Sequence, residues 1–117
     1  MDEPAGLGVV LVLTNCPDEA TAATIRRDLV ESRLAACVNQ LAPVRSTYHW
    51  QGAVEEAAEV PLLIKTTRRC YPALEARLRR LHPYSVPEIL AIPVERGGSD
   101  YLAWVVAETR ADTASDE

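Results

Sequence analysis

The sequence predicts an α+β fold in a single domain. Its 117 residues can bury one modest core, and 48% hydrophobic with 25% charged residues is ordinary for a globular chain. An apolar β-branched run, Val9–Leu13, is typical of a central strand that is buried on both faces. Helical and extended patterns then alternate along the chain, which favours a mixed class. We expect the folded domain to cover residues 7–110, with disordered tails at 1–6 and 111–117.

The first helix is predicted directly after this strand. Pro17 is tolerated in a first helical turn, and the acidic Asp18 and Glu19 suit the positive end of a helix. The apolar positions that follow recur at helical spacing. This helix should run to about Arg33.

The middle of the chain predicts a long β-hairpin. Residues 36–50 and 54–67 both read as extended, and Gln51-Gly52-Ala53 reads as the turn between them. Two prolines then face each other across the ladder, so the hairpin should bend at that level. The predicted register pairs Pro43 with Pro61, Arg45 with Glu59 and His49 with Glu55.

The last third of the chain completes the pattern. A second helix is predicted from Pro72 to the His82-Pro83 step, followed by an apolar strand over Glu88–Val94. Ser99-Asp100 is a predicted N-cap for a final helix. The order β-α-β-β-α-β-α matches a ferredoxin-like βαββαβ arrangement with a long hairpin and an extra C-terminal helix.

The length of the hairpin predicts self-association. A strand of about 15 residues spans about 50 Å at roughly 3.3 Å per residue. A domain with a radius of gyration near 13 Å has a diameter of only about 34 Å. The hairpin must therefore overhang its own domain and expose apolar side chains and strand edges, so we expect an obligate homo-oligomer.

Two short segments concentrate the polar and aromatic chemistry of the chain. These are Tyr48-His49-Trp50 and His82–Glu88, in a sequence with only 5% aromatic residues and no phenylalanine. Together with their surroundings they resemble the CutA divalent-cation tolerance family, over roughly Val9–Glu108. The residues that carry the resemblance are Thr14, Leu34–Asn39, Ser46–Trp50 with Gly52, Glu59, Ile64–Thr67, His82–Tyr84, Pro87–Ile89, Tyr101 and Trp104.

The resemblance implies a trimer with interlocking hairpins, a link to copper and other divalent cations, and a polar cleft where subunits meet. It is not complete. Thr14 and Leu81 stand where some members carry a cysteine and a second, adjacent histidine, and Ser85 stands where an acidic or amide residue is frequent.

Three residues are candidate metal ligands. His82 can bind copper or zinc through a neutral ring nitrogen, and Glu88 or the Cys16 thiolate could complete the site. Cys16 lies near a helix N-terminus, where thiol pKa values fall. The alternatives are structural: His82 caps the end of a helix, and Cys16 packs as a small apolar side chain.

A cleft between subunits is the second candidate site. A charged group on a central strand, here Lys65, needs a partner or an aqueous cleft. Such a cleft could bind a small anion, a metabolite or a metal complex, or the same polar groups could only hold subunits together. Its predicted lining is Tyr48, Trp50, Glu59, Lys65, Tyr84 and Trp104.

The composition of the chain argues against several classes of function. A formal charge of −5 disfavours nucleic-acid binding, and no apolar run is long enough to span a bilayer. Three cysteines without a C-x-x-C motif fit a reducing, cytoplasmic setting. We expect no enzyme and no organic cofactor, because no nucleophile with an orienting base is identifiable. The leading hypothesis is a homotrimeric protein that binds copper or a related divalent cation; the alternative is a trimeric small-molecule sensor.

Overall fold

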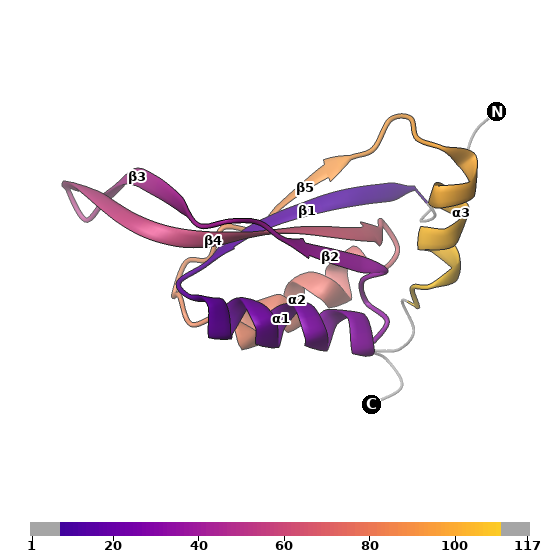
Figure 1. Cartoon of the computed structure of the whole chain (residues 1–117), viewed down its shortest axis with the longest axis horizontal. Coiled ribbons are helices and arrows are strands. Elements are labelled where there is room, and N and C mark those ends of the chain that lie inside the picture. Colours follow the sequence, from indigo (N-terminus) through magenta and orange to yellow (C-terminus); the bar gives the residue numbers. More distant parts are fainter. Residues whose placement is uncertain (1–7, 111–117) are drawn as a thin grey trace.

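An antiparallel sheet lies over two helices, and a third helix closes one end of it (Figure 1). The computed structural model describes residues 8–110, so the predicted tails lie outside the described residues. The α+β class is confirmed. The elements are β1 (Val9–Cys16), α1 (Glu19–Glu31), β2 (Cys37–Gln40), β3 (Val44–Trp50), β4 (Ala53–Thr67), α2 (Tyr71–Leu81), β5 (Leu90–Pro93) and α3 (Ser99–Ala107).

The sheet has the strand order β2-β4-β1-β5, and β3 pairs with the far half of β4. β1 is central, as its apolar run predicts. Its side chains alternate, however, rather than being buried on both faces. Val12 and Cys16 are buried over the helices, whereas Leu11 and Leu13 on the other face are only partly covered. The helices therefore cover one face of the sheet and leave the other face open.

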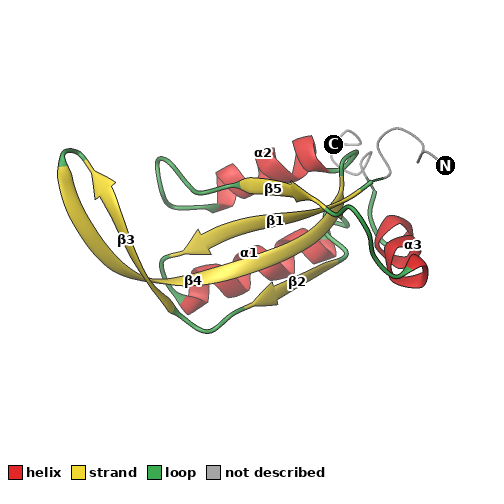
Figure 2. Cartoon of the chain, turned by 90° about the horizontal axis from the view of Figure 1, so that it is seen from above, coloured by secondary structure: helices red, strands yellow, loops and turns green. Residues whose placement is uncertain are grey.

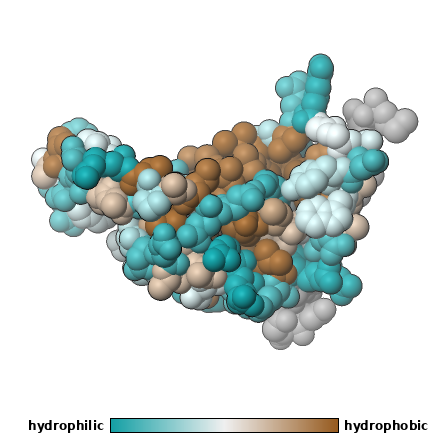
Figure 3. All heavy atoms as spheres, viewed as in Figure 1, coloured by the Kyte–Doolittle hydropathy of each residue, from teal (hydrophilic) through white to brown (hydrophobic). Residues whose placement is uncertain are grey.

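The open face is apolar. Leu90 and Ile92 on β5 pair with Leu13 and Leu11 on β1, and remain 52% and 45% exposed. Figure 3 shows hydrophobic residues gathered over β1 and β5 on this side of the molecule. A contiguous exposed apolar patch of this kind marks an association surface.

The hairpin closes with a tighter turn than the sequence predicts. Gln51 and Gly52 have φ of 50° and 83°, as a two-residue type I′ turn requires, and Trp50 pairs directly with Ala53. The predicted turn is one residue longer, so the predicted register is wrong by one residue throughout. The structure pairs Val44 with Glu59, Arg45 with Ala58, Tyr48 with Glu55 and His49 with Val54.

A bulge separates β2 from β3. Gln40 pairs with Leu62 and Val44 pairs with Glu59, so residues 41–43 face only residues 60–61. One extra residue on one strand bends an antiparallel ladder and increases its twist. The predicted bend is thus present at the predicted level, since Pro43 and Pro61 both lie within this bulge.

The helices differ from prediction at their ends. Asp18 is the N-cap of α1 and accepts a 2.7 Å hydrogen bond from the Thr21 N–H, and α1 ends at Glu31 rather than near Arg33. The N-cap of α3 is Gly98, without a side-chain cap, so the predicted Ser99-Asp100 cap is wrong. Within residues 8–110, no helix has both the length and the apolar character needed to cross a membrane.

We predict that Gly52→Ala destabilises the protein by about 1–2 kcal/mol, because a Cβ at positive φ strains the backbone. Guanidinium unfolding measures the change. Gly98→Ser is the matched control: its φ is −62°, a Cβ there meets nothing within 4 Å, and serine is a good N-cap. Equal stability of wild type and Gly52→Ala would contradict the turn.

Candidate functional site

A cleft of about 660 Å³ lies between the curved hairpin and the loop that joins α2 to β5. Figure 2 shows the hairpin curling to the side on which this loop lies. Of the predicted cleft and metal residues, the structure brings Tyr48, Trp50, Glu59, Tyr84 and Glu88 together here. The full lining is Asn15, Ser46, Thr47, Tyr48, Trp50, Glu59, Tyr84, Ser85, Val86 and Glu88.

Glu59 marks the point where β4 leaves the body of the sheet. It is only 8% exposed, and Tyr84 donates a 3.0 Å hydrogen bond from its hydroxyl to Oε2. A buried carboxylate requires such a donor. Burial of the phenol raises the pKa of Tyr84 to about 12, and the hydrogen bond and negative charge of Glu59 add to the shift.

His82 holds the loop that carries Tyr84. The imidazole is 6% exposed; its Nε2 lies 2.7 Å from the carbonyl oxygen of Asn15, and its Nδ1 accepts a 3.2 Å hydrogen bond from the Tyr84 N–H. A carbonyl can only accept and a backbone N–H can only donate, so the proton must be on Nε2. Both ring nitrogens are therefore engaged in bracing the cleft wall.

Asn15 connects β1 to the other side of the same loop. Its Nδ2 donates a 3.0 Å hydrogen bond to Oε1 of Glu88. Glu59 and Glu88 are thus two carboxylates on the lining. Among the described residues, those that line the cleft include no lysine, arginine or histidine. The lining is therefore anionic.

The chain is similar in sequence to a family of known proteins. The sequence model of the family described as CutA1 divalent ion tolerance protein matches residues 10–108. The chain belongs to the CutA1 divalent ion tolerance family. The resemblance noted in the sequence is confirmed.

Individual relatives agree with this assignment. The divalent-cation tolerance protein CutA of Thermus thermophilus is 48% identical over 99 residues, which cover 85% of this chain and 96% of the relative. Protein CutA of Homo sapiens is 45% identical over 107 residues, but this chain spans only 60% of its length. A solved structure of the Thermus thermophilus protein superposes with a TM-score of 0.86 at 47% identity, covering 87% of this chain and 99% of that one. A CutA structure from Xylella fastidiosa gives 0.86 at 46% identity, covering 88% and 99%.

In this CutA1-family chain, Cys16 is not the activated thiol that its position near a helix predicts. The residue is fully buried. Burial raises the pKa of the Cys16 thiol to about 11, and the negative charges of Asp18 and Glu59 raise it further. A thiolate at this place would be desolvated and would face two carboxylates. Cys16 is therefore a protonated thiol within the core.

The predicted ligands His82, Glu88 and Cys16 all lie near Asn15, but they do not form a ready metal site. Within residues 8–110, no three His, Cys, Asp or Glu side chains are grouped so that they could hold a metal ion. Metal binding by this set stays a prediction, and it requires His82 to release a hydrogen bond and Cys16 to lose a proton against its raised pKa.

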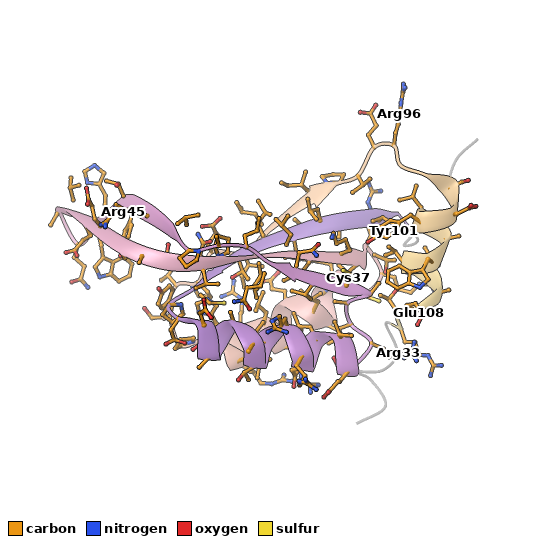
Figure 4. All side chains as sticks on the ribbon, in the orientation of Figure 1. Arg33, Cys37, Arg45, Arg96, Tyr101 and Glu108 are labelled. Carbon is orange, nitrogen blue, oxygen red and sulfur yellow. The ribbon has the colours of Figure 1, made fainter. Side chains whose placement is uncertain are left out.

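Lys65 and Trp104 do not line this cleft within one chain, and their predicted place in a cleft between subunits stays a prediction. Lys65 is six residues from Glu59 along β4, which is about 20 Å at 3.3 Å per residue. Its ammonium donates to Oδ1 of Asn39 and lies 4.0 Å from Sγ of Cys37. Trp104 packs on Tyr101 with ring centroids 5.5 Å apart, and Figure 4 labels Tyr101 and Cys37 at that end of the molecule. These groups form a separate cluster at α3, to which Tyr101 and Trp104 themselves belong.

Sequence reasoning missed the small polar residues of the lining. Asn15 is the most informative of them, because it contacts His82 through its backbone and Glu88 through its side chain. A polar residue at the end of an apolar strand is the signal that was available. Ser46, Thr47 and Ser85 stand out only through the family resemblance, since polar residues are ordinary in exposed hairpins and loops.

We predict that Tyr84 deprotonates near pH 12, two pH units above an ordinary tyrosine. The difference in tyrosinate absorbance between wild type and Tyr84→Phe isolates this group. The pKa of Tyr84 is higher in the folded protein than in the unfolded chain, so the protonated phenol stabilises the fold. This contribution to the free energy of unfolding is complete below pH 10 and is lost as the pH rises from 10 to 12. Glu59→Gln removes the negative charge and should lower the midpoint part of the way. A midpoint near pH 10 in the folded wild type would contradict the Tyr84–Glu59 contact.

Proposed function

We propose that this chain serves divalent-cation tolerance by binding a divalent cation in the acidic cleft, and that it does so as a homotrimer. The observation that carries the proposal is the lining of the cleft, with the carboxylates of Glu59 and Glu88 and no basic side chain among the described lining residues. Arg45, which directly precedes Ser46 on the hairpin, is paired with Glu56 at 3.6 Å. Figure 4 labels Arg45 on the hairpin. An excess of carboxylates in a concave site attracts cations.

The donor set is made of oxygen atoms. The lining also includes Asn15, Ser46 and Thr47, whose side chains carry further oxygen atoms. Such donors suit Mg²⁺, Mn²⁺ or Ca²⁺, whereas copper prefers imidazole and thiolate. The proposal therefore favours a hard cation at Glu59 and Glu88. Copper at His82 and Cys16 is the competing arrangement.

The homotrimer is supported by two features of the single chain. The open face of the sheet exposes Leu90 and Ile92, and the hairpin projects beyond the layer of helices (Figure 1). Both need a cover in water, because they combine apolar side chains with a free strand edge. The number of three subunits comes from the family resemblance. A cytoplasmic location and the lack of enzymatic activity stay predictions from the sequence.

A small-molecule sensor is the alternative, and the size of the cleft favours it. About 660 Å³ lies within the range of roughly 300–1,000 Å³ that is usual for small-ligand sites. Three aromatic side chains also line the cleft, and they offer a metal ion neither a carboxylate nor an imidazole. They are Tyr48, Trp50 and Tyr84. Binding of an organic ligand is therefore compatible with the same site.

Native mass spectrometry of the metal-free protein with added Mn²⁺, Mg²⁺ or Cu²⁺ tests the proposal. We expect a trimer that takes up Mn²⁺ or Mg²⁺. Glu59→Gln and Glu88→Gln should each weaken uptake about tenfold or more, which is about 1.4 kcal/mol, because each removes one of the two negative charges of the site. Both variants keep an oxygen that can accept the hydrogen bond of Tyr84 or Asn15.

Three variants serve as controls. Glu95→Gln removes an exposed carboxylate outside the cleft and should change nothing. Cys16→Ser should also leave uptake unchanged. Copper uptake could instead disappear in Cys16→Ser or His82→Ala and survive in Glu59→Gln and Glu88→Gln. That result would contradict the proposed site and support the competing copper site. A monomer would contradict the trimer.

A further inference from the structure

The chain has a single lysine among its 12 basic residues, and this lysine is the direct cross-strand neighbour of a cysteine. Lys65 on β4 pairs with Cys37 on β2, so the two side chains lie on the same face of the sheet. The Nζ of Lys65 lies 4.0 Å from the Sγ of Cys37 and donates a hydrogen bond to Oδ1 of Asn39. The sheet therefore holds an amine and a thiol side by side.

This pairing does not depend on how subunits are arranged. Both residues belong to one chain, and the Ala36 N–H donates a 2.9 Å hydrogen bond to the Lys65 carbonyl, which fixes β2 against β4 at this level. A neighbouring subunit that covers the open face of the sheet would leave the two groups together. Cys37 also hydrogen-bonds with Tyr101 of α3, and Figure 4 shows both side chains at the same end of the molecule.

The other two cysteines differ from Cys37. Cys16 and Cys70 are fully buried, whereas Cys37 and Lys65 are half-buried. Oxidation by peroxides converts an accessible cysteine to a sulfenic acid, which condenses with a nearby thiol or nitrogen. Without such a partner the sulfenic acid is oxidised further to a sulfinic acid, which is irreversible in most proteins. Cys37 is therefore the cysteine with a nitrogen placed to capture its oxidised form.

We propose that Cys37 and Lys65 form a reversible sulfenamide crosslink between β2 and β4 when the protein meets hydrogen peroxide. The Cys37 sulfur first attacks one peroxide oxygen; the O–O bond breaks, the sulfur is oxidised by two electrons, and water leaves. The Lys65 ammonium then gives one proton to solvent, its nitrogen attacks the sulfur, and the S–O bond breaks. The departing hydroxide takes a second proton from the nitrogen and leaves as water.

The crosslink joins β2, an edge strand, covalently to β4 inside the sheet. Its formation removes two hydrogen atoms from the neutral side chains and adds no oxygen, and a thiol reductant restores both groups. The inference is independent of the acidic cleft, because neither residue lines it. Failure of the metal experiment would leave the crosslink untouched, and absence of the crosslink would leave the metal site untouched.

Mass spectrometry of the full chain in its native assembly, before and after treatment with hydrogen peroxide, tests the proposal. We expect each subunit to lose two hydrogen atoms and to regain them with dithiothreitol. Trypsin should release residues 34–45 joined to residues 46–68, because a modified Lys65 is not cleaved. The joined peptide is detected in the wild type, so the result does not depend on the folding of any variant.

Lys65→Arg is the matched control, since it keeps a positive charge but its guanidinium stays protonated. This variant and Cys37→Ser should abolish the joined peptide, whereas Cys16→Ser and Cys70→Ser should leave it unchanged. A loss of two hydrogen atoms that persists in Lys65→Arg would indicate a disulfide and would overturn the inference. An unchanged mass, or oxygen added to Cys37 while Lys65 is still cleaved by trypsin, would overturn it as well.

Discussion

The continuous pairing of β4 is the constraint on which the remaining structure depends. Its C-terminal half, up to Thr67, is held between β1 and β2, and its N-terminal half, from Ala53, is held only by β3. The bulge at residues 41–43 falls between the two halves and bends the hairpin out of the plane of the sheet. Glu59 lies at this junction, which explains how a carboxylate on an otherwise projecting strand is buried.

The second wall of the cleft depends on one imidazole. His82 lies where α2 ends, and its two ring hydrogen bonds connect the strand end at Asn15 with the backbone of Tyr84. Tyr84 is thereby directed at Glu59, and Asn15 is directed at Glu88. His82 thus positions the wall of the cleft, and the lining itself combines carboxylates and aromatic rings with amide, hydroxyl and aliphatic side chains. This division of roles explains why the most conspicuous candidate ligand in the sequence is not itself on the cleft lining.

The sequence predicts the elements well, because apolar periodicity is a local signal. β1, the two long helices and the hairpin at Gln51-Gly52 all follow from it. Register does not follow, since local preferences do not separate a two-residue turn from a three-residue turn, and a slip by one residue alters every cross-strand pair. The same limit applies to the site. Lys65 and Trp104 lie apart from the cleft within one chain, and their place in a cleft between subunits stays a prediction. Asn15 becomes important only through contacts that tertiary structure creates.

The central claim is that His82 braces an acidic cleft rather than ligating a metal, and ¹⁵N NMR of the histidine rings tests it most directly. The chain has two histidines, so a His49→Gln variant assigns the signals. At alkaline pH we expect His82 as the Nε2–H tautomer, with Nδ1 accepting a hydrogen bond, and we expect this pattern to persist when Zn²⁺ is added. An Nδ1–H tautomer, or a ring nitrogen that shifts to a metal-bound value with Zn²⁺, would contradict the account.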